Sequence, residues 1–291
     1  MPAPIEELLT DHSYMCNALG DLMHAWHQRG DSGPLRMELL EPLAARIGFA
    51  SASFENLVSG TTRGGYTDTP ITFPDLASIY TIARSQLEAY LTFYYLYIGP
   101  QSDAECELKY NIYVVAGLTA RQSLRSEMEE LYKETKDERL PEVIAQINEE
   151  GARIERLKTI IEADALFNSL YTKSQRNSIL SITQPRARTQ SWTDIIKSSP
   201  LATVPFANRW SLYSNHAHSE YISLLQLSQY TMNISEHDTY TRLTALKGSL
   251  MVLSTFIGQF VDYMQLQPFC GELHTELQAM IRFWQQAAQS D

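Results

Sequence analysis

The sequence is poor in the residues that mark disulfide scaffolds, fibrous proteins and disordered chains. Its 291 residues include only three cysteines, Cys16, Cys106 and Cys270, which lie far apart without a Cys-x-x-Cys pair. This argues against a disulfide framework and against a zinc ribbon. With 13 glycines, 12 prolines and 44% hydrophobic residues, collagen-like, low-complexity and disordered chains are excluded. We therefore expect a folded protein in a reducing cytoplasm.

Basic residues and long apolar runs are scarce as well. There are 23 lysines and arginines against 34 acidic residues, a net charge of −11, so any surface that binds an anion must be local. The most apolar window, residues 248–261, is interrupted by polar residues and is shorter than the roughly 18 to 20 residues that span a bilayer. Residues 1–7 lack the basic and apolar regions of a secretory signal. We expect a soluble protein that does not bind a membrane.

Helical periodicity is what the sequence has in abundance. Apolar residues recur every three or four positions along almost the whole chain, and strand-like alternation is nearly absent. The pattern predicts an all-α fold, a single domain over residues 1–291 built as a bundle of about nine or ten helices. The clearest helix begins at Pro74 and ends at Gly99-Pro100, while residues 60–72, rich in Gly and Thr, are expected to form a loop. Three further helices are expected at roughly 205–230, 236–264 and 270–288.

Residues 101–170 are expected to form a charged helical hairpin that protrudes from the bundle. A capping box, Ser102-Asp-Ala-Glu105, opens a helix that should run to about Lys133. Of the 42 residues from Arg121 to Glu162, 19 are charged, and we interpret them as a solvated face rather than a binding site. Positions of the returning helix alternate by four and three, as in a coiled coil, with Gly151 and Lys158 as defects in an otherwise apolar seam: Leu140, Ile144, Ile147, Gly151, Ile154, Lys158 and Ile161.

One stretch after the hairpin is locally basic. Between residues 165 and 193 there is no acidic residue, and four basic ones appear: Lys173, Arg176, Arg186 and Arg188. If the protein binds RNA, this stretch, 173–188, is where it would hold the phosphate backbone electrostatically.

The sequence contains none of the short motifs of nucleotide-binding proteins, zinc proteases or α/β-hydrolases. His24 and His27, three positions apart, could bind a divalent metal from one helical face. Their segment ends in Gln28-Arg29-Gly30, so we expect them near a helix C-terminus, where the dipole favours imidazolium. We predict no metal site and no cofactor, with metal-assisted hydrolysis as the weaker alternative.

The most unusual segment is 208–219, which holds two of the seven histidines, one arginine and four hydroxyl side chains. On a helix, His216 and His218 are about 200° apart and cannot both bind one ion. Arg209, Tyr213 and His216 share one face, and the polar row Ser211, Ser214 and His218 shares the other. The apolar residues between these faces should be buried: Phe206, Trp210, Ala217, Tyr221 and Leu224. Their burial would place at least one of the two histidines at the edge of the core.

Arg84 and Glu88 lie four positions apart on the most apolar helix, where unpaired charges are costly. We expect them to pair with each other or with a polar group of another helix, and the row that contains Ser214 and His218 is the best candidate. We predict a polar pocket around Arg84, Glu88, Ser214 and His218, with Tyr213 and Asn215 as further binding residues.

Two short strings resemble a broad family of uncharacterised bacterial helical proteins, a domain of unknown function. They are Ile-Ala-Arg-Ser-Gln-Leu-Glu-Ala-Tyr-Leu at 82–91 and Leu-Tyr-Ser-Asn-His-Ala-His-Ser at 212–219. The resemblance covers about residues 73–260 and implies that Arg84, Glu88, Ser214 and His218 face one another. It implies no established reaction.

More distantly, the late Arg and His segment looks like the HEPN group. The catalytic members of that group are metal-independent RNases of toxin–antitoxin and phage-defence systems, in which Arg is followed by four to six residues and His. Arg209 and His216, with six residues between them, match this spacing. The resemblance implies an RNase site at the late segment.

Two functions of different class follow. The first is a module that binds a small ligand or a protein partner through the polar pocket around Arg84, Glu88, Ser214 and His218. The alternative is an endoribonuclease in which His216 or His218 is the general base for the ribose 2′-hydroxyl and Arg209 stabilises the phosphate in the transition state. Self-association into a homo-oligomer stays open.

Overall fold

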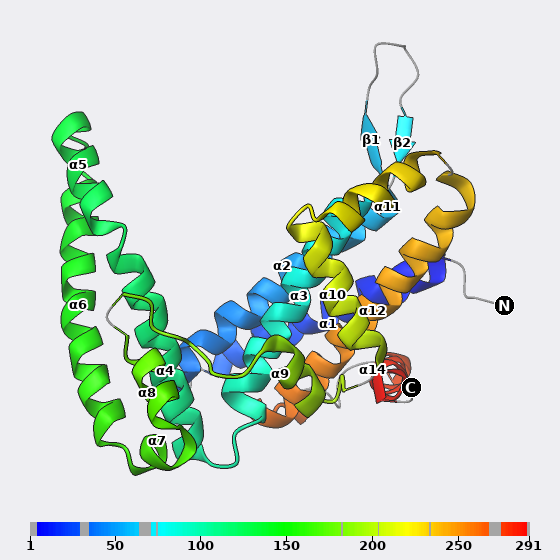
Figure 1. Cartoon of the computed structure of the whole chain (residues 1–291). Helices are drawn as coiled ribbons and strands as arrows, with labels where there is room; N and C mark the ends of the chain where they lie inside the picture. The colour runs from blue at the N-terminus through cyan, green and yellow to red at the C-terminus, as the bar shows by residue number, and fades with distance from the viewer. Residues whose placement is uncertain are drawn as a thin grey trace. The chain divides into compact units, whose positions relative to one another are not determined.

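A computed structural model gives the fold of the chain (Figure 1). The residues it describes are 5–29, 35–63, 71–73, 75–181, 183–202, 204–232, 234–267 and 275–289. Nearly all of them are helical, so the predicted all-α fold is confirmed. The helices are slightly more numerous than the nine or ten expected, because two predicted long helices are each broken into two.

The chain divides into two compact units, residues 1–99 together with 192–291, and residues 100–191. The predicted hairpin at 101–170 lies inside the second unit, which continues to residue 191. A single domain over 1–291, and a hairpin that protrudes from it, stay predictions. Each unit is described by itself below.

Four long helices form the centre of the first unit. α1 packs against α2 and α12, and α3 packs against α2 and α12, so the four enclose a common interior (Figure 1). Large buried aromatic side chains fill this interior, among them Phe54, Tyr90, Phe256 and Phe260. The four helices are α1 (Ile5–Arg29), α2 (Leu40–Ser59), α3 (Leu76–Phe93) and α12 (Ile234–Met264).

The clearest predicted helix is present and is capped at its start. The Asp75 carboxylate accepts a hydrogen bond from the backbone N–H of Ser78, which satisfies one of the free donors at the beginning of α3. After Phe93 the helix continues as one π-helical turn, η2 (Tyr94–Ile98), and ends at Gly99 as predicted. Pro74 lies outside the described residues.

The prediction of a loop at residues 60–72 is wrong at both ends of this segment. There the chain forms a short antiparallel pair, β1 (Thr61–Arg63) and β2 (Ile71–Phe73), with Thr61 opposite Phe73. Threonine and isoleucine supply four of the six paired residues, and β-branched side chains favour an extended backbone. The residues between the strands lie outside the described part of the chain.

Shorter helices complete the first unit: η1 (Leu35–Leu39), α9 (Trp192–Ser198), α10 (Val204–Ala217), α11 (Tyr221–Met232) and α14 (Thr275–Gln289). α10 packs on α3 and α14 packs on α12. The helix predicted at 205–230 is therefore two helices. Ser219 adopts a left-handed conformation with φ 53°, which ends α10 and turns the chain into α11.

This turn corrects part of the predicted core. Phe206 is buried as expected, while Trp210 and Ala217 are only partly buried. Tyr221 and Leu224 are 78% and 54% exposed, because α11 does not continue the buried face of α10.

One helix among the described residues is long and apolar enough to cross a bilayer. It is the part of α12 from Thr239 to Met264, and 78% of its most apolar window is buried inside the protein. This burial is what the central helix of a soluble protein shows.

The second unit contains α4 (Asp103–Gln122), α5 (Arg125–Thr135), α6 (Leu140–Ala163), α7 (Ala165–Leu170) and α8 (Lys173–Ile179). Ser102 caps α4 as predicted by accepting from the Glu105 N–H, but the Glu105 carboxylate accepts from Gln101 in place of Ser102. The helix expected to reach Lys133 is interrupted by a turn at residues 123–124.

The coiled-coil spacing of α6 is confirmed. Ile147, Ile154 and Ile161, seven residues apart, are its buried side chains. Ile154 and Ile161 pack with Leu108, Ile112 and other residues of one apolar cluster. None of the 19 charged residues from 121 to 162 is buried, as a solvated face requires, and the absence of a binding site there stays a prediction.

Candidate functional site

The structure brings together three of the predicted site residues, Arg84, Glu88 and His218. Arg84 Nε and Nη2 each lie 3.1 Å from Glu88 Oε1, and Nη1 lies 2.9 Å from His218 Nε2. The guanidinium also lies over the Trp210 ring, 5.2 Å from its centroid. The Arg84 and Glu88 side chains are 18% and 28% exposed. Arg84 therefore links α3 to the end of α10.

The chemistry of these groups fixes the state of His218. A guanidinium can only donate hydrogen bonds, so His218 Nε2 must accept. The imidazole is then neutral with its proton on Nδ1, and its Nε2 lone pair is already engaged. Ser214 and Asn215 are partly buried on α10 nearby in sequence. This cluster is a cross-link between helices, whose donors and acceptors serve the protein itself.

Replacing Glu88 with alanine is expected to lower the free energy of unfolding by about 1 to 3 kcal/mol, because two donor groups of a partly buried guanidinium lose their acceptor. Thermal unfolding followed by circular dichroism measures the change. The matched control is Glu130→Ala on α5, where the carboxylate is exposed and a change within about 0.5 kcal/mol is expected. Equal melting temperatures would show that the Arg84 pair contributes no more than a surface ion pair does.

The residues proposed for RNA cleavage lie in two different surroundings. His216 is buried, 6% exposed, and its Nε2 donates to Gln226 Oε1 at 3.1 Å. Burial lowers the pKa of His216, and its ring packs on Tyr80. Arg209 instead lies over the Phe206 ring and has Nη1 3.7 Å from Met251 Sδ. The expectation of one histidine at the edge of the core is confirmed, and RNA cleavage stays a prediction.

Tyr213, another predicted binding residue, is part of the core. Its side chain is 3% exposed and packs against Tyr80 with ring centroids 5.4 Å apart. Burial raises the pKa of Tyr213. Its hydroxyl would lie 3.0 Å from a Cβ at Gly248, so the glycine of α12 leaves room for the end of the Tyr213 side chain.

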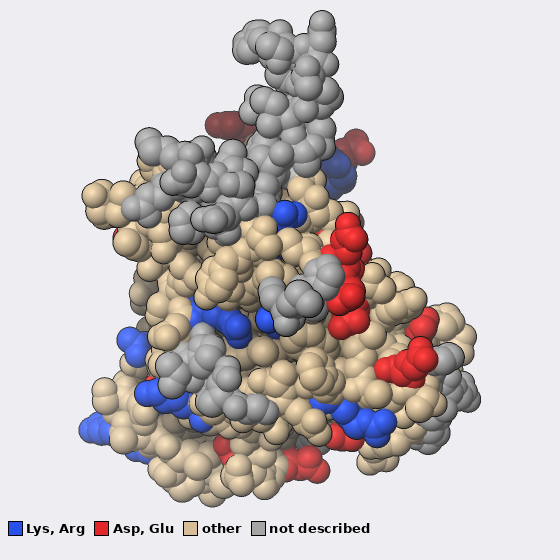
Figure 2. Space-filling view, turned by 90° about the vertical axis from the view of Figure 1, so that its right-hand side faces the viewer, with Lys and Arg blue, Asp and Glu red and all other residues tan. Residues whose placement is uncertain are grey.

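The basic stretch is partly structural. Arg176 Nη1 donates to the carbonyl oxygens of Asn168 and Tyr171, at 3.0 and 2.7 Å, and so ties α7 to α8. Lys173 and Arg186 are exposed, and Arg188 is partly buried. On the face shown in Figure 2, lysine and arginine side chains of the described residues are scattered among acidic and uncharged ones. RNA binding at 173–188 stays a prediction.

His24 and His27 lie in the last turns of α1, as predicted. His24 Nε2 accepts from the Gln28 side chain at 2.8 Å, while His27 is 74% exposed and lies 3.8 Å from Glu41. The two rings therefore have different partners.

A second polar site, at the centre of the first unit, is one that sequence reasoning missed. Each of the four central helices contributes one buried side chain: His12 of α1, Ser51 of α2, Gln86 of α3 and Ser249 of α12. Their exposed fractions are 2% or less, and three hydrogen bonds of 2.8 Å join them. The network crosses the whole bundle.

The donor and the acceptor of each hydrogen bond in this network can be assigned. Ser51 donates to the Ile47 carbonyl, the Gln86 amide donates to Ser51, and Ser249 donates to Gln86 Oε1. The one proton of Ser249 is then in use, so its oxygen accepts from His12 Nε2. His12 therefore carries a proton on Nε2, and Nδ1 is the ring nitrogen that lies outside the network.

The Nδ1 atom of His12 faces two further groups. Glu55 Oε2 of α2 lies 3.5 Å away, and Cys16 Sγ, one turn along α1, lies 3.6 Å away. The hydrogen bond with His12 holds the pKa of Glu55 below its usual value. Burial, together with the Glu55 charge, raises the pKa of Cys16 to about 12. At neutral pH the cluster thus holds a carboxylate and a thiol.

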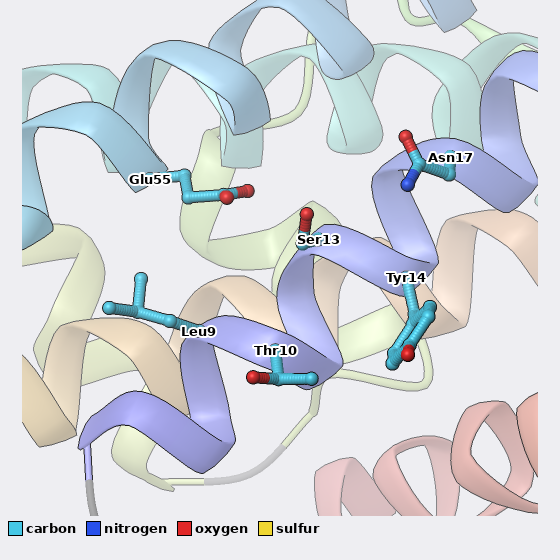
Figure 3. A pocket seen from close by; sticks show the side chains of 6 residues that line it. All are labelled: Leu9, Thr10, Ser13, Tyr14, Asn17 and Glu55. Carbon is cyan, nitrogen blue, oxygen red and sulfur yellow. The ribbon is translucent and has the colours of Figure 1, made fainter.

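A pocket of about 400 Å³ opens beside this cluster between α1 and α2 (Figure 3). The Glu55 carboxylate extends from α2 toward the Ser13 hydroxyl of α1, and Asn17 lies one turn further along α1. Glu55 is the one charged residue of the lining. The lining residues are Leu9, Thr10, Ser13, Tyr14, Asn17 and Glu55.

The sequence alone indicated only part of this site, the pair His12 and Cys16. His12 and Cys16 are four positions apart, a spacing that places two side chains on one face of a helix, but His12 also falls within the apolar stripe of α1. Glu55 is 39 positions beyond Cys16, and only the packing of α2 on α1 brings it close.

Comparisons with protein families, with characterised proteins and with solved structures found nothing that matches this chain. The resemblances at 82–91 and 212–219 therefore stay predictions.

Proposed function

We propose that the protein is a ligand-binding module and that its ligand site is the α1–α2 pocket rather than the cluster at Arg84. The observation that carries the proposal is the Glu55 carboxylate, 31% exposed and facing a polar pocket. Arg84, by contrast, already has Glu88, His218 and Trp210 as partners. A pocket supports ligand binding best where a charged group is accessible and held in place.

The lining indicates the class of ligand. Glu55 supplies a negative charge at neutral pH because its pKa is lowered, and Asn17, Thr10 and Ser13 add side-chain oxygens around it. Carboxylate and side-chain oxygens accept hydrogen bonds from an ammonium group. The volume of about 400 Å³ suits a small molecule. The proposed ligand is therefore a small organic cation.

A pair of probes of equal size and opposite charge tests this proposal. In NMR titrations of the ¹⁵N-labelled protein, propylammonium is expected to shift the backbone amides of residues 9–17, and propionate is not. Glu55→Gln should reduce propylammonium binding by more than about 10-fold, since a charged hydrogen bond is worth about 1.5 to 3 kcal/mol. Glu130→Gln on α5 is the control. Equal binding of both probes, or undiminished binding to Glu55→Gln, would contradict the proposal.

We also propose that the protein works in a reducing cytoplasm. The three cysteines lie far apart in the sequence and Cys16 forms no disulfide, as is typical of proteins kept in a reducing compartment.

A further inference from the structure

We propose that the cluster beside the α1–α2 pocket is a site for a divalent transition-metal ion, bound by His12 Nδ1, Cys16 Sγ and the Glu55 carboxylate. The inference rests on the proposed function in one respect, because Glu55 belongs both to the pocket and to the metal cluster. The metal ion would be a second cation that binds this carboxylate. The three ligand atoms lie within 4.8 Å of one another.

The distances between these atoms match a tetrahedral shell. Zinc bonds of about 2.0 Å to nitrogen and oxygen and about 2.3 Å to sulfur place N and O about 3.4 Å apart and N and S about 3.5 Å apart. The structure has 3.5 Å between His12 Nδ1 and Glu55 Oε2, and 3.6 Å between His12 Nδ1 and Cys16 Sγ. Two of the three distances between ligand atoms therefore fit the shell as they stand, and the third, between Cys16 Sγ and the Glu55 carboxylate, is within 4.8 Å.

The buried network orients His12 for this role. A histidine that binds a metal through one ring nitrogen usually donates from the other to a fixed acceptor, which sets its tautomer. His12 Nε2 donates to Ser249, which is in turn bonded to Gln86. Nδ1 is thereby directed at Cys16 and Glu55, and a bound metal ion would replace the Nδ1 proton of the hydrogen bond to Glu55, which is released to solvent.

The ligand set indicates the class of metal. One nitrogen, one thiolate and one carboxylate suit Zn²⁺ or Co²⁺ rather than Mg²⁺ or Ca²⁺, which prefer all-oxygen shells. Binding converts the Cys16 thiol to a thiolate and releases its proton to solvent, so the two anionic ligands balance the two positive charges of the ion. Three protein ligands leave a fourth position, which the pocket can supply with water or a ligand atom.

Cobalt(II) is the probe for this site, because thiolate coordination gives it a sulfur-to-metal charge-transfer absorption. The full-length protein is first treated with EDTA under reducing conditions. One equivalent of Co²⁺ is then expected to produce this absorption, and Zn²⁺ is expected to abolish it. Cys16→Ser should remove the absorption, and Glu55→Gln should weaken Co²⁺ binding by more than about 10-fold, since even an outer-shell change costs 10 to 100-fold.

Cys106→Ser in the second unit is the matched control and should retain the absorption, with circular dichroism confirming that each variant is folded. No absorption with the wild type, or an absorption that survives Cys16→Ser, would overturn the metal site. If propylammonium binds and Co²⁺ does not, the proposed function stands and the metal site falls. If Co²⁺ binds and propylammonium does not, the metal site stands and the organic-cation ligand falls.

Discussion

Raising the pH from 10 to 12 is expected to unfold the protein. Burial raises the pKa of Tyr80, Tyr90 and Tyr213 in the folded state, whereas in the unfolded chain a tyrosine ionises near about pH 10. The folded protein therefore retains three protons that the unfolded chain loses, and stability present below pH 10 falls as the pH rises. Each of these tyrosines lowers the free energy of unfolding by up to about 1.4 kcal/mol for each pH unit above 10. Together they reduce the free energy of unfolding by up to about 8 kcal/mol at pH 12, which is comparable with the usual total of about 5 to 15 kcal/mol.

Two signals measured together check this expectation. Loss of helical circular dichroism should coincide with a cooperative rise in tyrosinate absorbance, because the buried rings ionise only when the protein unfolds. Tyr90→Phe removes one of the three protons and should reduce the pH dependence by about 1.4 kcal/mol per unit. Tyr221→Phe, at a ring that is 78% exposed, is the control. Ionisation of all the tyrosines with helicity unchanged would contradict the prediction.

Replacing Gln86 with leucine is expected to lower the free energy of unfolding by about 2 to 4 kcal/mol. The leucine has nearly the same size, so the loss comes from hydrogen bonding. The Ser249 hydroxyl loses its acceptor and Ser51 loses a donor, both in the interior, and each unsatisfied buried group costs about 1 to 3 kcal/mol.

Chemical denaturation of the variant measures this loss. The control is Gln146→Leu on α6, where an exposed amide bonds to Arg121 and a change within about 0.5 kcal/mol is expected. A Gln86→Leu variant as stable as the control would mean that the buried network contributes nothing to stability.

Features that depend on local spacing could be predicted from the sequence. The seam of Ile147, Ile154 and Ile161 follows from a repeat of seven, which any packed helix of this kind must bury. The contact between Arg84 and His218 could also be predicted, because a guanidinium on a very apolar helix needs acceptors and few polar rows were available.

Features that depend on tertiary geometry could not be predicted. The apolar pattern continues in phase through Ser219, so nothing local marks the left-handed turn that exposes Tyr221. His12, Gln86 and Ser249 each stand alone within an apolar stripe, and their partners are 163 and 237 positions apart in the chain. Only the assembled bundle brings these polar groups together.

The order in which the ribosome synthesises the central helices affects how the nascent chain can fold. α1, α2 and α3 emerge first, and residues 100–191 follow as a compact unit before α12 is made. At about 5 to 20 residues per second, the 163 positions between Gln86 and Ser249 take roughly 10 to 30 seconds. During that interval α12 is missing from the bundle. The polar side chains of the first three helices lack Ser249 as a partner, and their apolar faces are accessible to chaperones until α12 is synthesised.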